Sequence, residues 1–136
     1  MNVTIGQIRK VLRDEPGLTV SGFKTLDEGY WTPDHGGFLT SDALKTIQVC
    51  VDFLSQFHDR PRRTSVSSHV LLNEVSKTMP DVKISHGAVI VAAKLTGLRC
   101  RRRPDRADVD ITLASKDWRR ISSRQAPLLG PLEVSP

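Results

Sequence analysis

The sequence predicts an α+β domain with a helical core and a C-terminal β-hairpin. Apolar residues recur every three or four positions from Thr40 to Phe57, which is the period of one helix face. A second segment, 85–96, is apolar on nearly every side, as expected of a helix at the centre of a core. Residues 98–114 instead alternate polar and apolar side chains on both sides of a turn, which is the pattern of a hairpin.

The first forty residues are predicted to form a short helix and an ordered loop. Residues 4–14 carry apolar side chains on one helical face, and the Pro16-Gly17 pair ends that helix. Residues 18–25 hold three spaced apolar side chains and are predicted as a strand. Residues 27–40 are rich in turn residues, and the aromatic side chains among them are expected to pin this loop to the core.

The second half predicts two further helices before the hairpin and a helical turn after it. The basic segment 60–63 contains Pro61, which cannot continue a helix and therefore ends the first long one. A helix is predicted over about 65–78 and another over 85–96. Val66, Val70, Leu71 and Val75 are predicted to form the buried face of the 65–78 helix. Residues 115–121 are predicted to make the last helical turn.

These elements predict one globular domain over residues 1–121. Residues 1–40 supply its N-terminal helix and ordered loop, and residues 41–121 supply the remaining helices and the hairpin. Residues 122–136 contain three prolines and no helical period, so they are predicted to be a flexible tail. The predicted core includes Ile8, Leu12, Leu44, Ile47, Val51, Leu54, Leu71, Val75, Val89, Ala92, Leu95 and Ile111.

The composition argues against several classes of protein. Hydrophobic residues make up 38% of the chain and charged residues 26%, which is ordinary for a globular domain. No run of about 18 apolar residues occurs, so no membrane partner is expected. The N-terminal residues lack the layout of a signal peptide, and a cytoplasmic location is expected. Cys50 and Cys100 lie far apart and are expected to be reduced thiols.

No pattern typical of a catalytic, cofactor or metal site occurs, so a non-enzymatic protein without cofactor or metal is predicted. The four histidines lack the spacing of metal ligands. Neither cysteine has the sequence context of an activated thiol. Gly36-Gly37 is not followed by the Lys and Ser or Thr of a phosphate-binding loop.

The distribution of charge indicates a polyanionic partner. The net charge is +5, yet residues 1–58 hold more Asp and Glu than Lys and Arg, so the positive excess lies in the second half. Residues 99–106 are the densest basic segment. Nucleic acid is the usual partner for such asymmetry, and DNA is the predicted one. The predicted binding residues are Arg62, Arg63, Arg99, Arg101, Arg103, Arg106, Arg119 and Arg120.

The predicted order of elements is similar to that of a winged helix-turn-helix domain. In that arrangement one helix enters the major groove of DNA, and the hairpin contacts the DNA backbone. Only alternate residues of a strand share a face, so Arg101 and Arg103, with Arg106 at the turn, are the expected outward set. Segment 85–96 offers few polar side chains for base readout. The more polar segment 65–78, or binding to the backbone alone, is therefore the alternative.

Other interpretations of the arginines remain open. Arginines on an exposed strand also prevent edge-to-edge pairing and keep a protein soluble. Arg103 and Arg106 have nearby acids in Asp105 and Asp108, and such exposed pairs contribute little to stability. A host protein is the alternative partner, and the sequence leaves homodimerisation open.

Three segments within residues 64–114 carry a resemblance to known proteins: the Ser-rich start of the helix at 64–69, the residue Val75, and Ile84-Ser85-His86-Gly87 leading into an Ala- and Val-rich helix. They resemble small proteins encoded on phages and integrative elements of proteobacteria, a group without an established activity. The resemblance implies a mobile-element context. It is compatible with a DNA-binding regulator or accessory factor, or alternatively with an inhibitor of a host defence protein.

Overall fold

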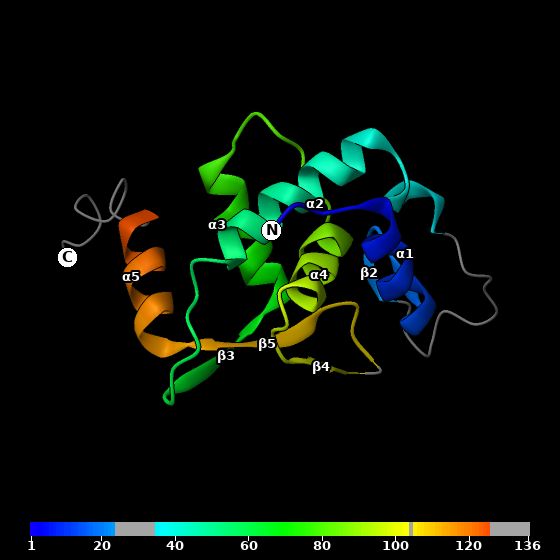
Figure 1. Ribbon diagram of the computed structural model, residues 1–136. Helices are drawn as coiled ribbons and strands as arrows, with labels where there is room; N and C mark the ends of the chain where they lie inside the picture. The colour runs from blue at the N-terminus through cyan, green and yellow to red at the C-terminus, as the bar shows by residue number, and fades with distance from the viewer. Residues whose placement is uncertain (24–34, 104, 126–136) are drawn as a thin grey trace.

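The structure, a computed structural model, describes residues 1–23, 35–103 and 105–125. The described residues form five α-helices, a short 3-10 helix and two small antiparallel sheets, so the predicted α+β class is confirmed. Figure 1 shows helices α2, α3 and α4 above the larger sheet, with α1 and α5 on opposite sides. In chain order the elements are α1 (Ile5–Asp14), β1 (Leu18–Thr19), β2 (Gly22–Phe23), η2 (Gly36–Phe38), α2 (Ser41–Leu54), β3 (Arg63–Ser67), α3 (Ser68–Thr78), α4 (His86–Leu95), β4 (Cys100–Arg102), β5 (Val109–Ala114) and α5 (Ser115–Gln125).

Helix α4 lies at the centre of the core, as its uniformly apolar sequence predicts. Every residue from Gly87 to Ala93 is buried. Helix α2 packs along α4, and α1, α3 and β2 also contact it. The Ser85 hydroxyl accepts a hydrogen bond from the backbone nitrogen of Ala88 at 3.2 Å and so caps the first turn. Gly97 follows the helix with a φ of 80°, a conformation that favours glycine.

The three strands of the larger sheet are antiparallel and lie in the order β3-β5-β4. Val66 of β3 and Cys100 of β4 both pair with Ile111 of β5, and this face of the sheet meets the helices. Side chains alternate between the two faces of a strand. Arg102 therefore lies on the same side as Cys100, as predicted, and Arg101 lies on the outward side.

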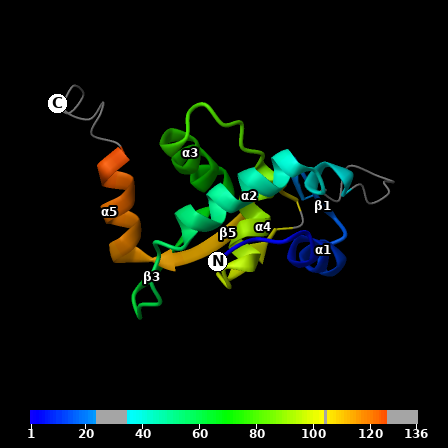
Figure 2. The same ribbon diagram turned by 45° about the horizontal axis from the view of Figure 1, so that its top comes forward.

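The N-terminal segment covers α4 and contacts the turn between β4 and β5. The single strand predicted for residues 18–25 is wrong, because β1 and β2 form a tight hairpin of two-residue strands. Gly22 in this hairpin has a φ of 105°. Val20 and Ser21 form the turn, and glycine tolerates the positive φ directly after it, so the apolar residues are divided between two strands. Figure 2 shows α1 and β1 on the side of α4 that is remote from α5.

Two further predictions of secondary structure are corrected, one at the start of α3 and one after the hairpin. Residues 63–67 form strand β3, not the start of a helix, because they pair with residues 110–114 of β5. Val70, which was predicted to be buried, is consequently 41% exposed on α3. The β4–β5 hairpin is followed by helix α5, so it is not the last element of the domain. Helix α5 includes residues 122–125, where the flexible tail was predicted to begin.

The predicted core residues are buried except for Leu44 and Leu95, which are only partly buried against the core. Phe38 from the predicted aromatic loop is buried, whereas Tyr30 and Trp31 lie outside the described residues, as do residues 126–136 of the predicted tail. None of the described helices is both long enough and apolar enough to cross a lipid bilayer.

Candidate nucleic-acid interface

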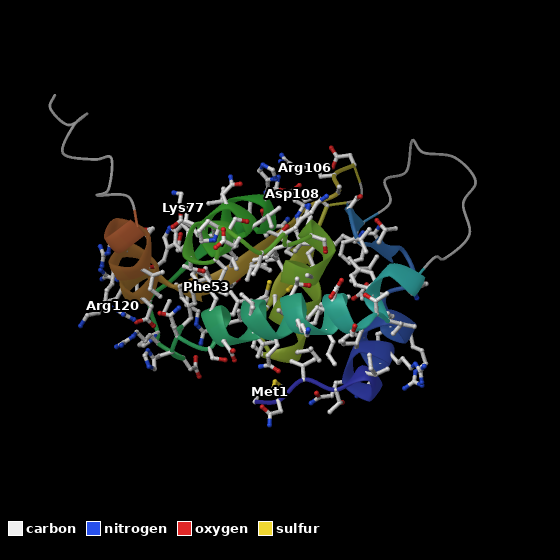
Figure 3. The ribbon with its side chains drawn as sticks, turned by 90° about the horizontal axis from the view of Figure 1, so that it is seen from above. Met1, Phe53, Lys77, Arg106, Asp108 and Arg120 are labelled. Atoms are coloured by element: carbon white, nitrogen blue, oxygen red, sulfur yellow. The ribbon has the colours of Figure 1, made fainter. Side chains whose placement is uncertain are left out.

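The eight predicted arginines fall into two groups at the two ends of β5. Arg101, Arg103 and Arg106 lie toward the turn between β4 and β5, where Arg101 pairs with Asp110 in the sheet register. The other five lie toward Ala114, the last residue of β5. Figure 3 shows the separation, with Arg106 beside the hairpin turn and Arg120 on α5 at the far side of the molecule. The five residues of the second group are Arg62, Arg63, Arg99, Arg119 and Arg120.

Two of the three arginines near the hairpin turn, Arg103 and Arg106, pair with aspartates. The Nε atom of Arg106 lies 2.8 Å from Asp108, and the guanidinium of Arg103 lies 2.8 Å from Asp110. Partial burial alone would raise the pKa of Asp108, but hydrogen bonds from Ser67 and Arg106 outweigh burial and hold this pKa below its ordinary value. The aspartate therefore stays charged at neutral pH. Two of the three predicted arginines at this end are thus paired, and Arg101 is exposed without an ion pair to any described residue.

The five remaining arginines come from three segments of the chain and line two pockets or lie beside them. Arg63 and Arg99 line one pocket of about 410 Å³, between the segment before β3 and the segment before β4. Arg62 and Arg119 line a neighbouring pocket of about 430 Å³ between that first segment and α5. We call this second one the α5 pocket, and its lining residues are Arg60, Pro61, Arg62, Lys116 and Arg119. We call the two pockets together, with Arg120, the basic end of the sheet.

Asp117 is a buried acid that pairs with Arg60 of the α5 pocket and with Arg120 of α5. Its side chain is 1% exposed. It accepts hydrogen bonds from the backbone nitrogen of His58 at 2.8 Å, from Nε of Arg60 at 3.2 Å and from Arg120 at 3.3 Å. The bond from the backbone of His58 is the largest cause that lowers the pKa of Asp117, and those from Arg60 and Arg120 add to it. The pKa of this carboxyl lies far below its ordinary value, so the charge is permanent at neutral pH.

A backbone hydrogen bond also joins the segment 60–63 to α5. The nitrogen of Ser115 donates a hydrogen bond to the carbonyl oxygen of Arg62 at 3.1 Å. Nε of Arg63 donates one to the carbonyl oxygen of Arg60 at 3.0 Å. Pro61 restricts the backbone between them. The cationic side chains therefore project from a braced segment.

The cations of the basic end differ in their existing partners. Arg60 and Arg120 pair with Asp117, and Arg63 pairs with Asp59 at 2.6 Å. Among the residues that the structure describes, no ion pair engages the other cationic side chains of this end. Those side chains are Arg62, Arg99, Lys116 and Arg119.

Sequence reasoning missed three members of the basic end: Arg60, Lys116 and Asp117. One signal could have found the two that lie on α5, Lys116 and Asp117. Lys116 and Arg119, like Asp117 and Arg120, are spaced i,i+3, which brings side chains together on a helix. The prediction that residues 115–121 are helical already implied that spacing. Nothing local indicated that Asp117 would be buried against residues 58–60.

In a winged helix-turn-helix domain, the helix at the position of α4 enters the major groove. Helix α4 has no exposed face that could contact bases, because every residue from Gly87 to Ala93 is buried. The β1–β2 hairpin lies between the start of α4 and the turn of the β4–β5 hairpin. Gly87 donates a hydrogen bond to the carbonyl oxygen of Val20 at 2.9 Å, and Phe23 donates one to that of Ala107 at 2.8 Å. The guanidinium of Arg102 lies 4.3 Å from the centre of the Phe23 ring. The space between the start of α4 and the turn of the β4–β5 hairpin is therefore filled by the β1–β2 hairpin of the protein itself.

The cysteines are poorly suited to nucleophilic chemistry. Burial raises the pKa of the Cys50 thiol to about 12 and that of the Cys100 thiol to about 11. Both thiols are free. Within the described ranges, no three His, Cys, Asp or Glu side chains are arranged to hold a metal ion.

Comparisons of this chain with protein-family models, with curated proteins and with solved structures find no match.

Proposed function

We propose that this chain is a non-enzymatic nucleic-acid-binding protein that contacts DNA backbone phosphates through the basic end of the sheet. The observation that carries the proposal is that Arg63 and Arg99 line one pocket, Arg62 and Arg119 line a second, and Arg120 lies on the same helix as Arg119. These residues are distant in sequence, and several of their charges have no partner among the described residues. Arginine side chains bind phosphate oxygens in a bidentate manner, so such a surface suits a polyanion.

The order of elements supports a winged-helix type of domain. From α2 to β5 the chain runs helix, strand, helix, helix, strand, strand, and the strands lie in the order β3-β5-β4. The filled space beside α4 removes the usual base-reading surface of such a domain. We therefore propose binding with little base preference, as expected of an accessory factor that recognises the backbone. The mobile-element context implied by residues 64–114 is part of this proposal.

The proposal is tested by measuring the affinity for a fluorescently labelled duplex over a range of salt concentrations. If about four cations contact phosphates, the slope of log K against log salt is about −4. The double variant Arg62→Glu/Arg119→Glu should bind weakly and show a shallower slope. The matched control is Arg9→Glu/Arg13→Glu, which makes the same change in charge on exposed residues of α1, on the opposite side of the molecule (Figure 1). Duplexes of unrelated sequence should bind alike.

Two results contradict the proposal. One is no binding to any duplex at low salt, which leaves a host protein as the alternative partner. The other is equal loss of affinity in the α1 control and in the Arg62/Arg119 variant, which means that only net charge matters.

A further inference from the structure

We propose that the α5 pocket is a binding site for a phosphate monoester, such as the terminal phosphate of a nucleic-acid strand. This inference rests on the proposed function and adds a ligand class to it. Among the residues that the structure describes, the pocket is lined by four cationic side chains and one proline, and by no acidic side chain. The buried acid Asp117, which pairs with Arg60 of the lining, already accepts hydrogen bonds from Arg60, Arg120 and His58.

The pocket is braced before any ligand enters. Arg60 uses Nε for its bond to Asp117, which leaves the two terminal nitrogens of its guanidinium for a ligand. The bond from Ser115 to the carbonyl oxygen of Arg62 fixes the opposite wall to the start of α5. Binding then requires the ordering of side chains but not of backbone, which reduces its entropic cost.

The charge of the pocket favours a dianion over a monoanion. The lining contributes four positive charges, and the single negative charge of Asp117 is already offset by Arg60 and Arg120. A terminal phosphate carries about −1.5 to −2 charges at neutral pH, whereas a phosphodiester carries one. The second negative charge of a phosphate monoester would interact mainly with Arg62, Lys116 and Arg119, which have no ion pair with any described residue.

The lining also indicates which part of a nucleotide is recognised. No aromatic side chain of the described part of the chain lines the pocket. Trp118, the nearest candidate on α5, stacks instead on Phe57 with a centroid distance of 6.5 Å. Stacking on a base is therefore absent from this site, and the phosphate itself is the recognised group.

The test compares two duplexes of identical sequence, one with 5′-phosphates and one with 5′-hydroxyl ends, by fluorescence anisotropy at physiological salt. The phosphorylated duplex should bind about fivefold more tightly. Arg62→Gln and Arg119→Gln should each abolish most of this difference, and the exposed α1 control Arg9→Gln should retain it. Melting curves by circular dichroism should be unchanged, because the substituted side chains are exposed.

A second measurement tests the pocket without nucleic acid. Inorganic phosphate is titrated into the protein while the side-chain Nε–H signals of Arg62 and Arg119 are followed by NMR, with Arg9 as the reference. Shifts confined to the pocket support the site, and shifts that are equal at all three arginines overturn it.

The outcomes separate the two proposals. Equal affinity for both duplexes overturns the monoester site and leaves backbone binding intact. Absence of binding to either duplex overturns the proposed function, and the phosphate titration then decides the pocket alone.

Discussion

The hydroxyl oxygen of Ser68 lies 2.7 Å from Nε2 of His86 and accepts a hydrogen bond from the backbone nitrogen of Val109 at 2.9 Å. Ser68 is fully buried. Its hydroxyl donates to the imidazole when Nε2 is unprotonated. One side chain thus joins the start of α3, the start of α4 and the start of β5.

Replacing Ser68 by Ala should destabilise the protein. The change leaves the buried N–H of Val109 without its acceptor, which costs about 1–3 kcal/mol of unfolding free energy. Urea denaturation measures the loss as a lower midpoint with an unchanged slope. Ser65→Ala is the matched control, because Ser65 is exposed on β3 and should alter stability by less than about 0.5 kcal/mol. Equal midpoints for Ser68→Ala and wild type would show that the bridge is not stabilising.

Stability should fall as the solution is acidified, because of His86. Burial lowers the pKa of His86 below 6.5, electrostatic repulsion between the imidazolium of His86 and His69 lowers it further, and Asp108 opposes both. Protons therefore bind the unfolded chain more readily, so this contribution is complete above pH 6.5 and is lost as the pH falls below it. His69, Asp108 and Arg106 are the charged groups that share a pocket with His86.

Urea denaturation between about pH 7.5 and about pH 5 measures this dependence. The variant His86→Gln cannot take up the proton, so its stability should vary less over that range. If the stability of His86→Gln varies with pH as that of the wild type does, another group causes the dependence.

Gly87 should not tolerate a side chain. A Cβ at this position would collide with the carbonyl oxygen of Thr19 and lie 2.7 Å from the ring of Phe38. Gly87→Ala would push the β1–β2 hairpin from α4 and should cost about 2–3 kcal/mol. Gly6→Ala on α1 is the control, since its Cβ meets nothing closer than 3.9 Å and alanine favours helix by about 0.5–1 kcal/mol. Thermal melts of the two variants should shift in opposite directions, and a stable Gly87→Ala would show that the hairpin moves freely.

Asp117→Asn should destabilise the protein and also alter its acid dependence. The buried carboxylate loses its charge while Arg60 and Arg120 remain, which should cost about 2–4 kcal/mol at neutral pH. Hydrogen bonds lower the pKa of Asp117, so its stabilising effect is complete at neutral pH and is lost as the pH falls below 3.8. The variant should lack that acid-dependent loss. Asp59→Asn is the control, because Asp59 is 90% exposed and its pair with Arg63 is solvated. Similar unfolding curves for both variants would contradict the structural role of Asp117.

The helical part of the fold was predictable because helix periodicity is local. The pattern of α2 and the uniformly apolar sequence of α4 identify their buried faces without reference to other segments. The β4–β5 hairpin was predictable for the same reason, as its strands alternate on both sides of a turn. Strand β3 was not, because its partner β5 lies more than forty residues away along the chain.

The candidate site divides in the same way. The sequence by itself determined that the second half is basic, that α4 is a core helix, and that Arg101 and Arg102 lie on opposite sides of a strand. Only the tertiary structure decided which arginines share a surface. Pairing of β3 with β5 brings residues 60–63 beside α5, and Asp108 and Asp110 pair with two of the hairpin arginines. Charge density is a property of composition, whereas the potential at a surface depends on distances between side chains that chain folding alone establishes.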